Sequence, residues 1–178
     1  TIPTTTYIHP MEEENFDLLV FSVRDIKTAK IPSFIEKIEP YAFNECRKIK
    51  NVEFCKNSKI QTIEKLAFYF SSIEKISIPE KLTKIGQLSF YCCQKLRNIE
   101  IPKNSRLQII EKSAFYDSGI ECFTIPASLM IIDEYAFYSC KKLQIIEIDE
   151  DSRLKFINHR IFDDNANVLI MSRVNLIK

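Results

Sequence analysis

An Ala-Phe dipeptide, or a close variant of it, recurs at regular intervals and constrains the fold more than any other feature of the chain. Its phenylalanines follow one another after 25, 22, 25, 22 and 25 residues. They are Phe43, Phe68, Phe90, Phe115, Phe137 and Phe162. An isoleucine stands five residues before each of them, and an isoleucine or leucine stands three residues earlier still. Self-similarity at such a period predicts a solenoid, in which each coil contacts only its neighbours.

A third apolar block, of the form apolar-x-x-apolar-x-apolar, leads from one Ala-Phe unit to the next, as in Leu96, Ile99 and Ile101. Its last residues alternate with a period of two, which predicts a strand with one buried face. One strand per 22–25 residues leaves no room for a hairpin, so the strands should lie parallel, about 4.8 Å apart. We expect a short extended piece to close each coil and the phenyl rings to fill the interior as a spine.

Two coil lengths alternate, so the repeating unit is a pair of coils 47 residues long. Short coils continue from the strand directly into a proline, such as Pro79. Long coils insert two residues there, in turns that contain Asn57, Asn104 and Asp151. Because Asn, Asp and Ser bond their own backbone in turns, the insertion predicts a wider turn.

The repeat also divides the chain. The array is expected to occupy residues 26–163, after an irregular N-terminal segment at 1–25. Residues 164–178 are expected to begin a further irregular segment or to form an open C-terminal end. Residues 18–22 resemble residues 168–172, and Lys178 stands where another coil would begin, which indicates a section of a longer array. A frayed native C-terminus is the alternative.

The repeated residues resemble a known family. Leu96, Ile99, Ile101 and Pro102 fit L-x-x-I-x-I-P. Residues 82–93 fit L-x-x-I-G followed by A-F-x-x-C with Ser89 in place of the alanine, and Gly86 is the one position that keeps the glycine. These are the motifs of the BspA-like leucine-rich repeats, which the chain resembles from about residue 26 to residue 162. The resemblance implies a leucine-rich-repeat solenoid with a parallel β-sheet on its concave face and loops, short extended or 3-10 segments on its convex side. It also implies a surface protein linked to adhesion.

Composition excludes several classes of partner. The chain has 25 basic and 24 acidic residues and a net charge of +1, so no bulk field attracts nucleic acid or an anionic membrane. Two glycines are too few for a glycine-rich phosphate cradle. No apolar run approaches the ~20 residues of a membrane span, and residues 1–10 do not resemble a signal peptide. We therefore expect no nucleic-acid partner and no membrane span in this segment.

The titratable residues predict no enzyme, metal or cofactor. Cys46, Cys93 and Cys140 stand 47 residues apart, which places them about 10 Å from one another, too far for disulfides. They are expected to be buried thiols, whereas Cys122 is expected to be exposed. No Cys-x-x-Cys pair offers a metal site, and the two histidines, His9 and His159, form no triad with serine and aspartate.

One arrangement of carboxylates could indicate an enzyme. Glu53, Glu100 and Glu147 occupy equivalent positions, and paired carboxylates of this kind carry glycoside hydrolysis in other proteins. Because the position repeats along the stack, a solvated column is the favoured interpretation.

The candidate binding surface is the concave face of the sheet. The third and fifth residues of each strand block should point away from the core and form two columns. The candidate ligand-binding residues are Asn51, Glu53, Lys75, Ser77, Asn98, Glu100, Cys122, Thr124, Ile145 and Glu147. Their mixture of charges, amides and hydroxyls suits a protein or glycan ligand. A merely solvated surface is the alternative.

Two further columns are candidates for contact. Lys59, Arg106 and Arg153 recur in the wider turns, where a sulfated glycan or an acidic partner could use them, although solvated charges are the alternative. A tyrosine follows four of the spine phenylalanines and predicts a stacked ladder on the convex side, or else a hydrophobic contact strip. These tyrosines are Tyr69, Tyr91, Tyr116 and Tyr138.

The leading functional hypothesis is a cell-surface or extracellular module that binds a protein or glycan, such as extracellular matrix or a host surface. Adhesion comes from the family resemblance. The first alternative is an intracellular scaffold in the cytoplasm, which reduced cysteines and the absent signal peptide favour. The second alternative is a structural spacer within a longer repeat array.

Overall fold

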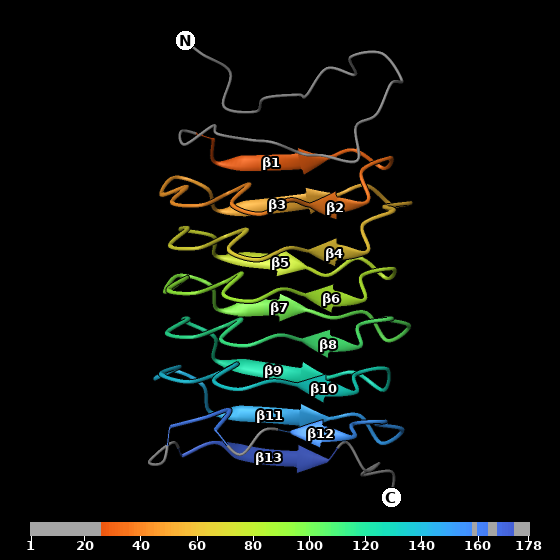
Figure 1. Cartoon of the computed structure of the whole chain (residues 1–178), viewed down its shortest axis with the longest axis vertical. Helices are drawn as coiled ribbons and strands as arrows, with labels where there is room; N and C mark the ends of the chain where they lie inside the picture. The colour runs from red at the N-terminus through yellow and green to blue at the C-terminus, as the bar shows by residue number, and fades with distance from the viewer. Residues whose placement is uncertain (1–25, 158–159, 164–166, 173–178) are drawn as a thin grey trace, which may run out of the picture.

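The computed structural model describes residues 26–157, 160–163 and 167–172, and it is a stack of coils with parallel strands on two sides (Figure 1). The first side carries β1 (Thr28–Ile31), β3 (Asn51–Phe54), β5 (Lys75–Ser77), β7 (Asn98–Glu100), β9 (Cys122–Ile125), β11 (Ile145–Ile148) and β13 (Leu169–Ser172). The second side carries β2 (Lys37–Ile38), β4 (Thr62–Ile63), β6 (Lys84–Ile85), β8 (Ile109–Ile110), β10 (Ile131–Ile132) and β12 (Phe156–Ile157). The described residues contain no helix. The predicted solenoid of parallel strands is confirmed.

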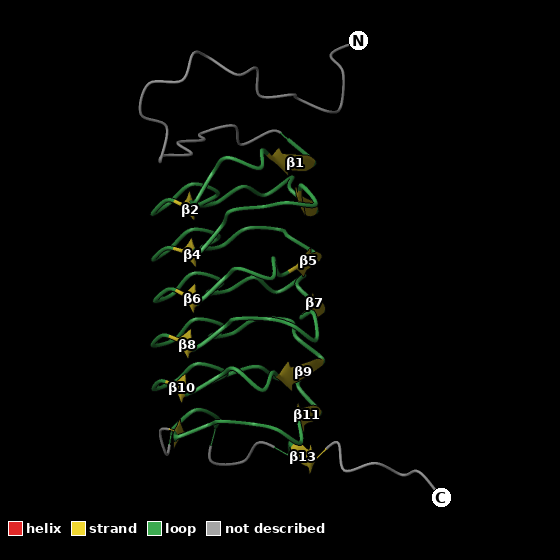
Figure 2. Cartoon of the chain, turned by 90° about the vertical axis from the view of Figure 1, so that its right-hand side faces the viewer, coloured by secondary structure: helices red, strands yellow, loops and turns green. Residues whose placement is uncertain are grey.

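The short extended pieces that close the coils form a sheet of their own. The even-numbered strands, from β2 to β12, make one continuous six-stranded parallel sheet. The stack therefore has a strand ladder on each side, and both ladders repeat at about 4.8 Å. Because the two sides advance equally, the coils stack along a nearly straight axis (Figures 1 and 2). We call the outer surface of the first side, which the sequence predicted as the concave face, the strand face.

The first side is interrupted once. Hydrogen bonds join β1, β3, β5 and β7 in one sheet and β9, β11 and β13 in another. At the inward position, β5 and β7 carry Ile76 and Ile99, whereas β9 carries Phe123. The Phe123 ring packs 5.8 Å from that of Phe115 and 4.9 Å from that of Phe137. The ladder is thus interrupted at the coil in which a phenylalanine first takes the inward strand position.

The last strand extends the array beyond residue 163. β13 pairs in parallel with β11, so that Leu169 lies beside Ile145 and Met171 beside Glu147. Leu169, Ile170 and Met171 are exposed. The similar segment at residues 18–22, together with His9, His159 and Lys178, lies outside the described residues.

The predicted phenylalanine spine is present. Successive rings stack nearly parallel, with centroid separations of 4.9, 4.9, 5.2, 5.3 and 6.1 Å along the series from Phe43 to Phe162. Columns of isoleucine and leucine from both sheets enclose the rings, and the first five rings are almost wholly buried. Stacked aromatic pairs contribute about 0.5–1.5 kcal/mol each beyond their burial, so the spine stabilises every interface between coils.

The chain passes each of the first five spine phenylalanines through a turn that contains two residues with positive φ. In one coil these are Leu66 (φ 62°) and Phe70 (φ 54°). The turn points the N–H groups of Leu66, Phe68 and Phe70 toward the next coil, where they donate to carbonyl oxygens at 3.0, 2.7 and 2.9 Å. None of the ten such residues is a glycine. A left-handed conformation costs a non-glycine residue about 1–2 kcal/mol, and this third ladder of hydrogen bonds offsets that cost.

The retained glycine has a packing reason. Gly86 donates its N–H to the Ile63 carbonyl oxygen at 2.7 Å. A Cβ at position 86 would lie 2.7 Å from that oxygen and from the carbonyl carbon of Glu64. The two coils therefore approach more closely here than a side chain allows.

Candidate binding surface

The outward-pointing residues of the strand face lie in the two columns expected from the sequence. The parallel register places Asn51 beside Lys75 and Lys75 beside Asn98. After the break, Cys122 lies beside Ile145 and Thr124 beside Glu147. The intervening residues Val52, Ile76, Ile99, Phe123 and Ile146 are buried.

The fifth-place column is linked in pairs from one coil to the next. Lys30 Nζ lies 3.8 Å from Glu53 Oε2. The Ser77 hydroxyl donates a hydrogen bond to Glu100, and the Thr124 hydroxyl donates one to Glu147 at 3.3 Å. Each of the three carboxylates thus holds a side chain of the preceding strand.

A charged row at the start of the strands is paired in the same way. Lys50 Nζ lies 2.9 Å from Glu74 Oε1, and Arg97 Nη1 lies 2.5 Å from Glu121 Oε1. The hydrogen bond from Lys50 lowers the pKa of the Glu74 carboxyl. Exposed pairs of this kind add little stability, but their opposite charges offset one another's electrostatic field at the start of the strands.

The third-place column differs between the two halves of the face. In the first half it presents Asn51, Lys75 and Asn98, and Lys75 is exposed and forms no ion pair with any described residue. In the second half the same column presents Cys122, Ile145 and Leu169. The third-place column therefore changes from polar to apolar where the ladder between β7 and β9 is interrupted, while the fifth-place column keeps Thr124 and Glu147.

A hollow of about 630 Å3 lies over the carboxyl ends of β3 and β5, and we call it the first hollow. The hollow lies between two long coils, which contribute the wide turn at residues 55–58 and Pro102 to its lining. The short coil between them contributes Pro79. Because the short coil lacks the two inserted residues, the surface steps down between two wider turns. Asn51, Glu53, Lys75 and Ser77 are among the lining residues.

A second hollow, of about 450 Å3, lies over the next short coil. Pro102 and Lys103 line one part of it, and Asp149, Glu150 and Asp151 another. Lysines line the first hollow, among them Lys56 and Lys81. The two hollows arise from the same alternation of coil lengths but differ in charge.

The structure brings together only part of the predicted site. Four of the ten candidate residues line the first hollow, and Thr124 lines the second. The other five lie on the strand face but line neither hollow; they are Asn98, Glu100, Cys122, Ile145 and Glu147. Sequence reasoning missed the contribution of the turn residues, which include Lys56, Asn57, Glu80 and Lys81. The two-residue insertion was the signal that could have identified them.

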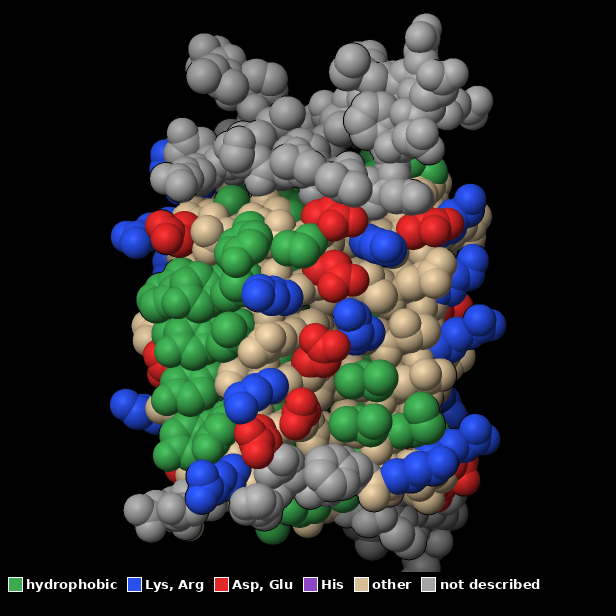
Figure 3. Space-filling model, viewed as in Figure 1, with side chains coloured by type: hydrophobic (Ala, Val, Ile, Leu, Met, Phe, Trp, Pro, Cys, Tyr) green, Lys and Arg blue, Asp and Glu red, His purple; other side chains and the backbone are tan. Residues whose placement is uncertain are grey.

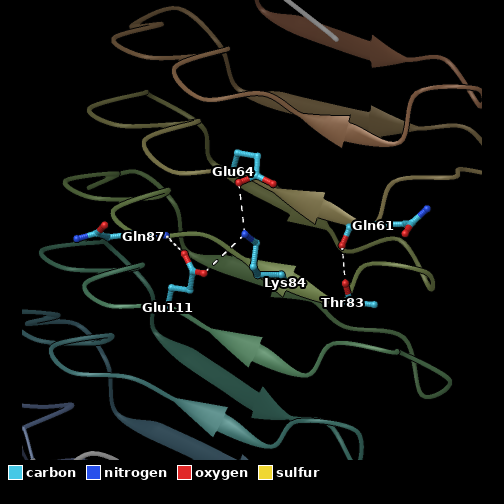
Figure 4. A network of polar contacts seen from close by, with 6 residues as sticks. All are labelled: Gln61, Glu64, Thr83, Lys84, Gln87 and Glu111. Carbon is cyan, nitrogen blue, oxygen red and sulfur yellow. Dashed lines mark hydrogen bonds and ion pairs between the residues drawn. The ribbon is translucent and has the colours of Figure 1, made fainter. Parts of the chain in front are cut away.

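The outer surface of the second sheet carries charges of both signs in close succession (Figure 3). Lys84 Nζ lies 3.4 Å from Glu64 Oε2 and 3.6 Å from Glu111 Oε1, so it connects three coils (Figure 4). Glu111 also accepts a hydrogen bond from the Gln87 backbone N–H at 2.9 Å. This network satisfies its own charges, which suits a structural role.

The tyrosine ladder is observed as a stacked column. Rings of adjacent coils lie 5.1, 4.9 and 5.5 Å apart in the series Tyr69, Tyr91, Tyr116 and Tyr138. Apolar side chains form a vertical band at this edge of the molecule (Figure 3). Because the rings stack on one another, their faces are already occupied.

The cysteines are free thiols, and three of them are buried as expected. Burial raises the pKa of Cys93 to about 12 and that of Cys140 to about 11, so both thiols stay protonated. The Cys93 thiol donates to the Phe68 carbonyl oxygen at 2.9 Å, and Cys140 does the same to Phe115. Cys122 is exposed, as predicted.

No group of three or more His, Cys, Asp or Glu side chains among the described residues could hold a metal ion. The same part of the chain contains no helix of the length and apolarity that a membrane span requires.

The sequence motifs and the geometry agree with the comparison with protein families. Residues 15–144 and 108–175 match the family described as BspA type Leucine rich repeat region, in six copies. The chain belongs to this family. BspA-type leucine-rich repeat proteins are typically protein-binding surface proteins, and leucine-rich repeats are generally non-catalytic binding modules. The predicted family and fold class are thereby confirmed.

Solved structures share the fold. The BspA-type chain is similar to the pneumococcal vaccine antigen PcpA, with 30% identity and a TM-score of 0.69, over 71% of this chain and 31% of that one. It is also similar to a leucine-rich repeat protein from Bacteroides ovatus, with 23% identity and a TM-score of 0.65, over 81% and 45% of the two chains.

A leucine rich cell surface protein from Faecalibacterium prausnitzii shares 24% identity, with a TM-score of 0.51 over 71% and 39% of the two chains. The BspA-type chain therefore spans less than half the length of each of these relatives. A search of curated proteins finds no match.

Proposed function

We propose that the chain is the protein-binding part of a cell-surface adhesion protein, and that its partner docks on the strand face around the first hollow. The observation that carries the proposal is the convergence of Asn51, Glu53, Lys75 and Ser77 on one hollow. The volume of about 630 Å3 lies within the range of roughly 300–1,000 Å3 that ligand sites occupy, and it has room for a few side chains of a partner.

The surroundings of the first hollow suit protein recognition. Two strand ladders and the phenyl spine hold its floor, so binding orders little of the chain. Lys75 and Asn51 offer a charge and an amide toward the solvent, and buried Ile76 and Ile78 lie beneath. A partner that inserts an apolar side chain flanked by acceptors would satisfy both kinds of group.

The compartment is supported by the family. BspA-type proteins are typical of cell surfaces, and the pneumococcal relative is described as a vaccine antigen. A surface location would bring the strand face into contact with matrix or host-surface proteins.

A matched pair of variants tests the docking site. Purified chain is first screened for binding to immobilised extracellular-matrix and host-surface proteins and glycans, and the tightest protein ligand is then titrated. Lys75→Glu should weaken that binding by at least about tenfold, the effect of a central contact in an interface. Lys37→Glu makes the same change at an exposed lysine on the opposite sheet and should leave binding unchanged. Equal binding by both variants, or a screen in which no protein binds, refutes the proposal.

An intracellular scaffold is a second candidate, and one observation favours it. All six cysteines lie in the described residues and are free thiols, as is usual in a reducing compartment. Antibody against the chain would label permeabilised cells but not intact ones if this candidate is correct, whereas labelling of intact cells supports a surface location.

A further inference from the structure

Three successive coils place a cation at the same position in the turn before the second sheet. Lys59, Lys81 and Arg106 each stand three residues before a residue of that sheet, and those residues, Thr62, Lys84 and Ile109, lie side by side in register. The cations therefore follow one another at the strand spacing of about 4.8 Å. Spacing between equivalent long coils revealed Lys59 and Arg106 but not Lys81, because Lys81 belongs to the short coil between them.

The inserted residues of the long coils add two more cations. Lys56 and Lys103 precede Asn57 and Asn104 in the wide turns. We call Lys56, Lys59, Lys81, Lys103 and Arg106 the basic edge. All five side chains are exposed. The turn segments 55–59, 79–82 and 102–107 that carry them contain one acidic residue, Glu80, so five positive charges and one negative charge give a net charge of +4.

The cations of the basic edge are unpaired, and they stand in three consecutive coils, whereas Lys95 and Lys141 stand in alternate coils. None of the five forms an ion pair with any residue in the described ranges. By contrast, Lys30, Lys50, Lys84, Arg97 and Lys112 each lie within 4 Å of a carboxylate. Basic side chains line the edge of the molecule at which the first strands lead into the second sheet (Figures 1 and 3). Unpaired like charges in a row produce a local positive field that a polyanion would neutralise.

The spacing and the residue types favour one polyanion. Four of the five cations are lysines, which act as point charges and lack the planar fork with which arginine grips a single carboxylate. In an extended acidic peptide, side chains on one face repeat at about 6.6–7 Å, which does not match the cations of the basic edge. A sulfated glycan carries an anionic group on most sugar units, and successive units advance by a distance close to one coil. The amides of Asn57 and Asn104 can donate to its sulfates and hydroxyls.

We propose that the basic edge binds a sulfated glycan that lies along the stack axis. The inference does not depend on the protein-binding function proposed for the first hollow. Lys59 and Arg106 do not line that hollow, although Lys56 and Lys81 do.

The test titrates the chain with a defined sulfated oligosaccharide and with its desulfated counterpart at low salt. The wild type should bind the sulfated form, and binding should weaken as salt screens the charges. The triple variant Lys59→Glu/Lys81→Glu/Arg106→Glu should bind it roughly tenfold or more weakly, since three exposed charge contacts are reversed. If this variant does not fold, the same three residues are changed to Gln, which should produce a smaller loss in the same direction.

A control with the same change in net charge uses the opposite edge of the coils. Lys95→Glu/Lys141→Glu/Lys142→Glu alters three exposed lysines in the turns before the first strands and should bind the oligosaccharide like the wild type. Absence of binding, equal binding of the desulfated form, or an equal loss in the control overturns the inference. Tighter binding of a polyglutamate peptide or of single-stranded DNA overturns it in favour of that class of ligand. None of these outcomes depends on the protein that occupies the first hollow.

Discussion

One buried hydroxyl group gives the sharpest test of how the coils pack. Position 89 precedes the spine residue Phe90 and is fully buried, and the Ser89 hydroxyl oxygen has no hydrogen-bond partner among the described residues. The equivalent position is alanine in four other coils, at Ala42, Ala67, Ala114 and Ala136. The replacement Ser89→Ala therefore removes an unsatisfied polar atom and installs the side chain that the neighbouring coils carry.

The expected effect is a gain in stability. Burying a hydroxyl without a partner costs about 1–3 kcal/mol in proteins. The lost contacts of one oxygen atom offset a small part of this, so we expect the free energy of unfolding to rise by about 1–2 kcal/mol. For a chain of this size, each kcal/mol raises the melting temperature by about 2–4 °C, which corresponds to an increase of roughly 2–8 °C.

Urea and thermal unfolding followed by circular dichroism would measure the change. The converse replacement, Ala67→Ser, places the same hydroxyl at the equivalent position of the preceding coil and should lower stability by a similar amount. Should Ser89→Ala leave the urea midpoint unchanged or lower it, the hydroxyl has a partner and the reasoning fails. A neutral Ala67→Ser would contradict it independently.

Three other predictions concern the spine, the turns and the thiols. Phe90→Ala should lower the free energy of unfolding by about 3–5 kcal/mol, because its ring is buried between two stacked neighbours. Phe162→Ala should lower it by less, since that ring is partly exposed and lies 6.1 Å from the ring of Phe137. Urea unfolding of the two variants measures the difference. Glu45→Gly should raise the free energy of unfolding, measured with urea, by about 0.5–1 kcal/mol, because residue 45 has a φ of 53°, while Glu45→Ala should give no such gain. Burial raises the pKa of Cys93 from 9.0 to about 12, so between those pH values the unfolded chain loses a proton that the folded chain keeps, and stability should fall as pH rises. Cys93→Ser should remove that part of the slope in unfolding measured against pH.

The fold was accessible from the sequence because each apolar residue of a coil has one structural role. Phe68 and Phe90 must stack if their coils are to share a core, and Ile63 and Ile85 then fall into register without further information. Other features depend on competition between effects that spacing does not show. The ladder is interrupted between β7 and β9, and the turns use left-handed residues such as Leu66 with no glycine to mark them.

The candidate surface was accessible only in part. Alternation with a period of two placed Glu53 and Ser77 outside the core, but it did not show that the carboxylates of the column already hold side chains of the preceding strand. That pairing depends on rotamers, which the sequence does not specify. The first hollow depends on a difference in length between neighbouring coils, and the role of Lys81 depends on which residues that difference brings into line.

The alternation of coil length separates the requirements of folding from those of recognition. The residues that stack from coil to coil are held by three ladders of backbone hydrogen bonds and by the spine, so a change there disturbs every neighbouring coil. The inserted residues lie outside these ladders, and their charge changes along the stack from Lys56 and Lys103 to Glu150 and Asp151 without any change in the core. A partner that contacts the inserted turns therefore contacts residues that can vary with little loss of stability. By this reasoning, exchanging Lys56 and Lys103 for acidic residues should alter binding while leaving the unfolding midpoint nearly unchanged, since exposed unpaired charges contribute little to the folded state.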